Sequence, residues 1–302
     1  MQEIMTDEIS KIALACYGKT PGISRFYSVN NSVFLLKYDN EDKVLKIERD
    51  GDLQWKIKNE IAMIALAQQQ GLPVPVIEHI GTDGNIIPNH WYIMKRAGSL
   101  NLHGCFLHKN DKNTRELYSE FGRILGRIHQ VTLQRQGYLK ADRINEFIFG
   151  EVINKRFERC IRKLSGQLAN KEIHKLTNII GSFKESKQTR LCHKDFGPWH
   201  AIIDKNKIVA IIDWEFAEGS DEIYDFVKSE LFLYIYSGNL EEFREGYCEI
   251  QPLPPDFESV AMPYRVIETL NLMTFVKNNQ NLFFKIKKVL DSIITSNGLV
   301  WR

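Results

Sequence analysis

The stretch from residue 193 to residue 225 gathers residue types that could carry out phosphoryl transfer. Asp195 lies in a short segment broken by a glycine and a proline, and His200 follows it by five residues, at the start of an apolar strand. Asp213 ends the returning strand, so a strand–turn–strand hairpin would bring His200 and Asp213 to the same end. One carboxylate could then orient or deprotonate an attacking hydroxyl, while the other groups hold Mg²⁺ against the phosphates of a nucleotide.

The same residues carry a resemblance to a known family. The pattern H-x-D-x-x-x-x-[NH], followed by I-D-W-E and a trailing acidic pair, resembles that of the aminoglycoside phosphotransferase family, which includes macrolide and small-alcohol kinases. The matching residues are His193, Lys194 and Asp195, His200 in the slot that usually holds Asn, Ile212–Glu215, and the pair Asp221 and Asp225. The resemblance implies a bilobal, protein-kinase-like fold, Asp195 as the catalytic residue, and His200 with Asp213 as metal ligands.

The N-terminal part of the chain agrees with this resemblance. Lys46 stands where a kinase-like strand presents its phosphate-binding lysine, and Glu60 on the following helix could pair with it. No G-x-G-x-x-G loop precedes Ser32, and the segment Ser28–Ser32 stands in its place, with Ser32 as the candidate for a phosphate contact. The segment 93–98 resembles the family's hinge, where the backbone of three residues would meet the nucleotide base: Met94, Lys95 and Ala97.

Hydrophobic periodicity predicts the elements that must position these residues. Residues 32–38 and 43–47 indicate a hairpin, 57–70 a helix that ends at Gly71, and 76–80 and 91–94 two more strands. After Gly98 the period is helical, with helices expected from residue 113, over 141–169, over 173–183 and near the C-terminus, interrupted by the hairpin at 200–214. We therefore expect an α+β fold: a small N-terminal β-sheet lobe with one helix, binding nucleotide (residues 1–97), and a larger, mainly helical C-terminal lobe for catalysis and substrate (residues 98–302).

Each of these residues also has a structural interpretation. Lys46 could be a solvated strand lysine, Glu60 a surface acid on a helix, and Asp195 a turn residue beside Gly-Pro. A non-catalytic, kinase-like scaffold is a further alternative, but a degraded site would usually have lost at least one of Lys46, Glu60, Asp195 and Asp213. A protein kinase is disfavoured, because the chain between Asp213 and Asp225 is too short to form a platform for a peptide.

The acceptor is suggested by local charge. Six acidic residues follow the predicted metal aspartate, opposed locally only by Lys228: Glu215, Glu218, Asp221, Glu222, Asp225 and Glu230. Such a cluster suits a cationic acceptor, such as an aminoglycoside antibiotic, and would imply antibiotic resistance. The same acids could instead begin a solvated helix, which leaves macrolides, choline, sugars and amino alcohols open as acceptors.

The donor and metal follow from the resemblance. It implies ATP or GTP as the phosphate donor and Mg²⁺ as the metal. A neutral imidazole at His200 binds divalent ions, although Mg²⁺ prefers oxygen, so we also expect tolerance of, or preference for, Mn²⁺.

The composition of the chain excludes several classes of protein. Forty basic and 38 acidic residues give a net charge of +2, which does not favour nucleic-acid binding. The five cysteines form no C-x-x-C pair, which indicates a reducing compartment. The acidic, polar N-terminus does not resemble a signal peptide, and no apolar run reaches the ~18 residues of a membrane span. We expect a cytoplasmic enzyme, a monomer or weak dimer, whose partners are a nucleoside triphosphate and a small hydroxylated substrate.

Overall fold

The computed structural model of the 302-residue chain describes residues 6–28, 30–49, 55–106, 112–139, 149–184 and 188–296. The chain divides into two compact units. The first comprises Met1–His108, Tyr138–Ile144 and Trp199–Ala217, and the second comprises Lys109–Gly137, Asn145–Pro198 and Glu218–Arg302. The hairpin that carries His200 and Asp213 thus clusters with the N-terminal sheet, although the predicted boundary at residue 98 assigns it to the C-terminal lobe.

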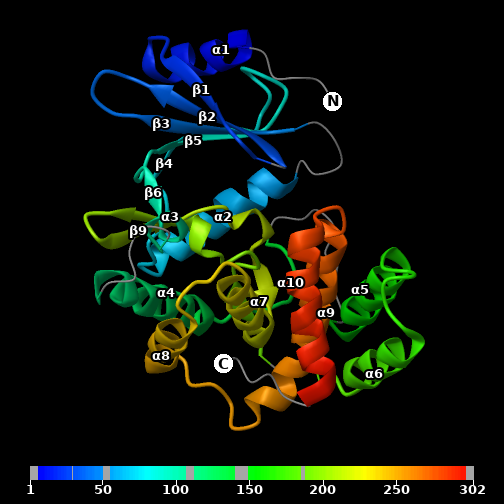
Figure 1. Ribbon diagram of the computed structural model, residues 1–302. Helices are drawn as coiled ribbons and strands as arrows, with labels where there is room; N and C mark the ends of the chain where they lie inside the picture. Colours follow the sequence, from blue (N-terminus) through cyan, green and yellow to red (C-terminus); the bar gives the residue numbers. More distant parts are fainter. Residues whose placement is uncertain are drawn as a thin grey trace. The chain divides into compact units, whose positions relative to one another are not determined.

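The first unit is built on a five-stranded antiparallel sheet in the order β1-β2-β3-β5-β4 (Figure 1). A three-stranded sheet in the order β6-β8-β9 follows it. The elements are α1 (Thr6–Tyr17), β1 (Gly22–Phe26), β2 (Asn31–Lys37), β3 (Lys43–Glu48), α2 (Trp55–Gln69), β4 (Ile77–Gly81), β5 (Trp91–Lys95), β6 (Leu100–Asn101), α3 (Leu102–Phe106), β8 (Ala201–Asp204), β9 (Lys207–Ile211) and the 3₁₀ turn η2 (Trp214–Phe216). A second 3₁₀ turn, η1 (Pro198–His200), leads into β8.

Each face of the larger sheet is covered by one helix, and the strand period decides which side chains meet which helix. Leu45 belongs to a buried cluster with Ile12 of α1 on one face. Val44 belongs to a cluster with Ile57 of α2 on the other face (Figure 1). Because side chains alternate along a strand, Lys46 shares the face of Val44, and a one-residue slip of β3 would turn it away from α2.

Several predicted elements of this unit are confirmed. β2 and β3 form the expected antiparallel hairpin, and α2 ends just before Gly71, whose φ of 68° is the left-handed conformation that glycine adopts readily. The hairpin of β8 and β9 is confirmed too. Lys205 and Asn206 at its turn have φ values of 48° and 59°, as tight hairpin turns require.

Two elements of the first unit do not follow from the predicted pattern. The expected N-terminal lobe has one helix, whereas α1 is a second one, whose Ile9, Ile12 and Ala13 are buried. Because acidic and polar residues surround its short apolar stripe, this segment shows no clear helical period in the sequence. β1 is mostly exposed, so it carries little of the apolar alternation that identifies a strand.

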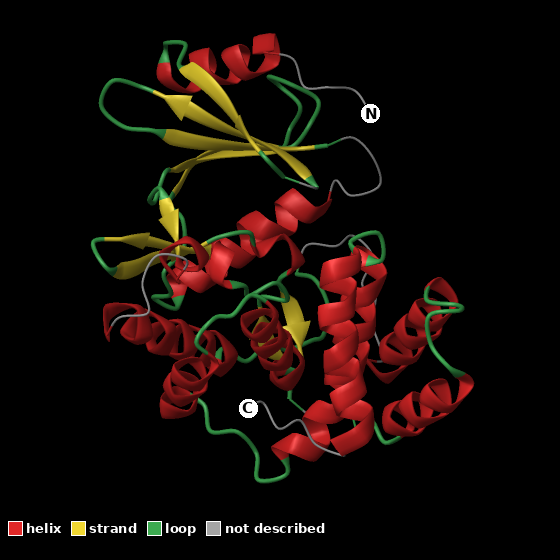
Figure 2. Cartoon of the chain, in the orientation of Figure 1, coloured by secondary structure: helices red, strands yellow, loops and turns green. Residues whose placement is uncertain are grey.

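The second unit is mainly helical, and its described residues include one short pair of antiparallel strands (Figure 2). Its elements are α4 (Lys112–Gln130), α5 (Phe149–Lys163), α6 (Asn170–Gly181), β7 (Arg190–Cys192), β10 (Glu218–Ser220), α7 (Glu222–Ile235), α8 (Leu240–Ile250), α9 (Phe257–Val276) and α10 (Gln280–Ser296). The helical C-terminal region is confirmed, but residues 141–148 of the helix predicted over 141–169 lie outside the described residues. None of the described helices combines the length and apolar character that a membrane crossing requires.

Glycines allow α4 and α8 to cross closely. A Cβ added to Gly122 would lie 2.0 Å from the carbonyl oxygen of Phe243, and a Cβ added to Gly246 would lie 2.0 Å from the carbonyl oxygen of Ser119. Neither clash can be relieved by a side-chain rotation, since the opposing atoms belong to helix backbone. The crossing therefore depends on glycine at both positions.

We predict that Gly122→Ala lowers the free energy of unfolding by about 1–3 kcal/mol, because the added methyl group forces the two helices apart. Urea unfolding monitored by circular dichroism measures this. Gly181→Ala is the matched control, since a Cβ there would meet no atom within 4 Å. Equal stability of Gly122→Ala and the wild type would contradict the close crossing.

Candidate active site

Lys46 is the centre of a buried charge cluster in the first unit. Its ammonium nitrogen lies 2.8 Å from Glu60 Oε2 and 2.7 Å from Asp213 Oδ1. Glu215 Oε2 is 3.6 Å away. The three carboxylates come from α2 and from the turn after β9, so the strand, the helix and the hairpin each supply one part of the cluster.

Burial and neighbouring charges shift the pKa values of these groups in opposite directions. Burial alone would lower the pKa of Lys46, but the carboxylates of Asp213 and Glu60 hold that pKa well above its ordinary value. Burial raises the pKa of Glu60 to about 7, against the opposing effect of Lys46. Glu60 Oε1 also accepts a hydrogen bond from the backbone N–H of Trp214 at 3.1 Å. The cluster therefore keeps a positive charge on Lys46 although its side chain is buried.

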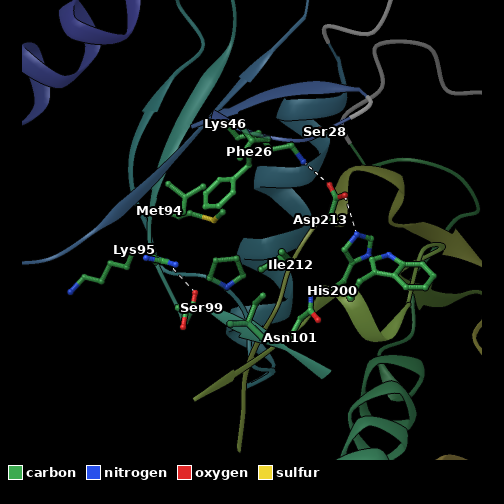
Figure 3. A pocket seen from close by; sticks show the side chains of 18 of the residues that line it. Phe26, Ser28, Lys46, Met94, Lys95, Ser99, Asn101, His200, Ile212 and Asp213 are labelled. Carbon is green, nitrogen blue, oxygen red and sulfur yellow. Dashed lines mark hydrogen bonds and ion pairs between the residues drawn. The ribbon is translucent and has the colours of Figure 1, made fainter. Parts of the chain in front are cut away.

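Asp213 is held in an unusual backbone conformation at the end of β9. Its φ of 67° and ψ of 56° lie in the left-handed region, which aspartate tolerates better than most residues. Its Oδ2 lies 3.3 Å from Nε2 of His200, on the side away from Lys46 (Figure 3). Burial opposes ionisation, but Lys46 and His200 hold the pKa of Asp213 well below its ordinary value. A carboxylate oxygen and an imidazole nitrogen that lie side by side can both coordinate a divalent cation.

These residues line a cavity of about 380 Å³ within the first unit (Figure 3), a size typical of small-molecule sites. The structure brings seven of the predicted site residues to its wall: Lys46, Glu60, Met94, Lys95, Ala97, His200 and Asp213. Ser32 is not among the lining residues that are described; it is buried on β2, 3.5 Å from Nε of Arg49. Ser28, earlier in the same segment, does line the cavity.

The segment that leaves β5 closes one side of the cavity. A Cβ added to Gly98 would lie 2.9 Å from the carbonyl oxygen of Ile203, so the backbone approaches β8 as only glycine permits. Arg96 anchors the segment through Nη1, 2.7 Å from Asp42 Oδ2. The side chain of Lys95 points away from the other labelled residues in Figure 3, so its backbone is the part that faces the cavity.

Asp195 lies in the second unit, in a loop fixed by one buried carboxylate. Asp225 accepts hydrogen bonds from the backbone N–H groups of His193 at 2.6 Å and Lys194 at 2.9 Å, one to each oxygen. Lys194 has a φ of 67°, a strained value for lysine, and these bonds hold it there. His129 contacts Asp225 Oδ2 at 3.3 Å and, against the cost of burial, helps to lower the pKa of Asp225.

Lys228 contacts the carboxylate of Asp195 directly. Its Nζ lies 3.1 Å from Asp195 Oδ1 and also donates to the carbonyl oxygen of Lys194. Burial opposes its charge, but Asp195 raises the pKa of Lys228 above its ordinary value. The sequence gives Lys228 no role beyond opposing the acidic cluster. Only its position three residues after Asp225, about one helical turn, could have suggested this contact.

Most of the acidic cluster is used within the fold. Glu218 pairs with Lys194 at 3.1 Å, and Asp221 caps α7 through the N–H of Ile223 at 2.8 Å. Buried Glu230 contacts two arginines that come from α8 and α9, Arg244 and Arg265. Glu215 contacts the cluster around Lys46, and Asp225 braces the loop of Asp195. These five acids therefore have structural partners before any acceptor binds.

The amino-acid sequence of this chain is similar to those of known proteins. The family model described as the phosphotransferase enzyme family matches residues 23–261. A curated protein of Mus musculus, acyl-CoA dehydrogenase family member 10, is 22% identical over 250 residues, which are 75% of this chain and 23% of that protein. The chain thus spans about a quarter of the length of that relative.

Solved structures match nearly the whole chain at low sequence identity. A thermostable mutant of aminoglycoside phosphotransferase APH(4)-Ia, in a ternary complex with AMP-PNP and hygromycin B, has a TM-score of 0.68 and 15% identity, over 96% of this chain and 98% of that one. A protein of Haemophilus somnus 129PT, provisionally described as a fructosamine-3-kinase, has a TM-score of 0.67 and 16% identity, over 96% and 97%. These likenesses confirm the predicted protein-kinase-like α+β fold.

We predict that Asp225→Asn destabilises the protein by about 2–3 kcal/mol, because an amide nitrogen replaces one acceptor and leaves a buried backbone N–H without a partner. Urea unfolding curves at neutral pH measure the difference. Asp204→Asn, at an exposed hairpin position, is the control for loss of one negative charge. If both variants unfold at the same urea concentration, Asp225 does not brace the loop as described.

Proposed function

This chain belongs to the phosphotransferase enzyme family, and from that premise we propose that it transfers the γ-phosphoryl group of ATP or GTP to a hydroxyl group of a small molecule. The observation that carries the proposal is the contact of Lys46 with Glu60 and Asp213 at the wall of one cavity. A buried lysine held charged by two carboxylates is suited to bind phosphate oxygens. The AMP-PNP in the APH(4)-Ia complex supports a nucleotide as the donor.

We propose that the nucleotide phosphates bind near Lys46, which Glu60 orients. The backbone at Met94, Lys95 and Ala97 would contact the base, as the resemblance of this segment to a hinge implies. Ser32 stays a candidate for a phosphate contact. Residues 1–97 would then act as the nucleotide-binding lobe and residues 98–302 as the catalytic and substrate-binding lobe.

His200 and Asp213 are the proposed ligands of Mg²⁺ or Mn²⁺. Their side chains face each other across 3.3 Å and offer one imidazole nitrogen and a carboxylate, which fits a divalent ion. When bound, the ion would neutralise charge on the phosphates. Asp213 already holds its negative charge through Lys46 and His200, which lower its pKa.

Asp195 is the proposed catalytic residue. It would orient the acceptor hydroxyl and accept its proton. Since the transition state is largely dissociative, the proton transfer contributes less than positioning and charge neutralisation. The ammonium of Lys228, 3.1 Å away, would orient the carboxylate for this task.

We propose an aminoglycoside-like antibiotic as the first acceptor to test, because the APH(4)-Ia complex holds hygromycin B. Activity of this kind would confer antibiotic resistance. A second candidate is a kinase of another small alcohol, such as a macrolide, choline, a sugar or an amino alcohol. The internal partners of five of the six clustered acids favour it, since a polycation would find few uncompensated carboxylates among them. We further propose a cytoplasmic location, which the five free cysteines support.

We predict that the wild type forms a phosphorylated product and ADP or GDP with at least one acceptor from a panel of aminoglycosides, macrolides and small alcohols. Asp195→Asn should lower turnover by about 10²–10⁴-fold, the contribution of a general base, with nucleotide affinity unchanged. Product formation is followed by mass spectrometry. Nucleotide binding without turnover on any acceptor would instead favour a non-catalytic scaffold, and undiminished turnover by Asp195→Asn would exclude Asp195 as the base.

We predict that Mn²⁺ supports turnover at least as well as Mg²⁺, because His200 offers nitrogen where the family usually has the oxygen of Asn. His200→Asn should shift the ratio of the two rates toward Mg²⁺. The measurement is the initial rate at saturating concentrations of each ion. A wild type that works better with Mg²⁺, with a ratio that His200→Asn leaves unchanged, would contradict the role of His200.

A further inference from the structure

Two neighbouring asparagines, Asn30 just before β2 and Asn31 at its first residue, stand where a glycine-rich phosphate loop is expected. Asn30 donates its side-chain amide to Glu215 Oε1 at 2.5 Å. Asn31 donates its own amide to the other oxygen, Glu215 Oε2. One carboxylate is thus held by two neighbouring residues through both of its oxygens. We call these three residues the asparagine clamp.

The segment Ser28–Ser32, which contains these asparagines, is also held from the other side. Arg49, just after β3, donates Nη2 to the carbonyl oxygen of Ser28 at 3.0 Å and places Nε 3.5 Å from Ser32 Oγ. Hydrogen bonds of side chains therefore hold the described residues of this segment at both of its ends. A glycine-rich loop has no side chains that could make such bonds.

The environment of Glu215 shows that the clamp is not an incidental surface contact. The residue is 2% exposed, and a buried carboxylate requires partners. Lys46 lies 3.6 Å and Lys56 3.8 Å from its oxygens, both longer than hydrogen bonds to the two asparagines. The asparagine amides are therefore its nearest hydrogen-bond donors among the described residues.

The clamp joins two walls of the cavity. Phe26, Tyr27 and Ser28 line one wall, and Asn30 follows Ser28 by two residues; Asp213 lines another wall, two residues before Glu215. All of these residues belong to the first unit. The hydrogen bonds of Glu215 to the asparagines therefore fix the distance between the wall formed by Phe26, Tyr27 and Ser28 and the turn that carries Asp213.

We propose that Asn30 and Asn31 are nucleotide-positioning residues, which use Glu215 to hold the segment after β1 in a conformation ready for the nucleotide before it binds. The inference rests on the proposed nucleotide site and goes beyond it, because it assigns the function of the missing glycine-rich loop to side-chain amides. Binding to a cavity that is already ordered costs less conformational entropy than binding to a mobile loop.

The test is the affinity of the full chain for AMP-PNP and GMP-PNP with Mg²⁺, measured by calorimetry without an acceptor. The double variant Asn30→Ala/Asn31→Ala should raise the Kd about tenfold, since only a fraction of molecules would hold the competent conformation. Asn85→Ala, an exposed asparagine of an unrelated turn, should bind like the wild type. Unchanged or tighter binding by the double variant, with an unchanged melting temperature, overturns the proposal.

A thermodynamic cycle separates positioning from a general loss of stability. In a Glu215→Leu background, which offers no acceptor to either asparagine, adding the two alanines should change the Kd by less than about twofold, because residues that act through one contact are not additive. A full tenfold effect in that background would show that the asparagines act independently of Glu215, and the proposal would be wrong.

Hydrogen exchange of the nucleotide-free protein tests whether the clamp orders this segment, without relying on nucleotide binding. The backbone amides of Ser28 and Asn31 should exchange faster in the double variant than in the wild type, and equally in Asn85→Ala. If the wild type binds neither nucleotide, the proposed function fails, while this measurement still shows whether the clamp orders the segment. Equal exchange in all three proteins refutes the clamp itself.

Discussion

The first unit depends on the ion pairs that the buried ammonium group of Lys46 makes with nearby carboxylates. The carboxylates of Glu60 and Asp213 lie 2.8 Å and 2.7 Å from it, and each comes from a different element. Removing Lys46 would leave the buried carboxylate of Glu60 without its counter-charge, which is far more costly than the loss of a surface ion pair. The register of β3, the approach of α2 and the turn after β9 are therefore all constrained by one ammonium group.

In both units, a buried carboxylate holds a segment of the proposed site in place by accepting hydrogen bonds from N–H donors. In the second unit, Asp225 accepts the backbone N–H groups of His193 and of the strained Lys194 and so sets the position of Asp195. In the first unit, Glu215 accepts side-chain amides from Asn30 and Asn31. In both cases the carboxylate is too buried to be satisfied by water, so the donors are held firmly.

The sequence predicts those features that depend on local patterns. The β2–β3 hairpin, α2 and the hairpin that ends at Asp213 follow from periodicity, and motif spacing singles out His200 and Asp213, which line the cavity. It does not predict α1, whose apolar stripe is short, or the three-residue strands β7 and β10. It does not reveal the internal partners of the acidic cluster, because Arg244 and Arg265 come from helices distant in the chain. Long-range contacts of this kind leave no local signal.

We propose that the charge of Lys46 binds the phosphates of a nucleotide in the cavity that it lines. Calorimetric titration of the wild type and of Lys46→Met with AMP-PNP and Mg²⁺ tests it most directly. We expect saturable binding of one nucleotide per chain by the wild type and an affinity at least about tenfold lower for Lys46→Met, the value of one charge-assisted hydrogen bond. Equal affinity of the two proteins, or no binding by the wild type, would contradict it.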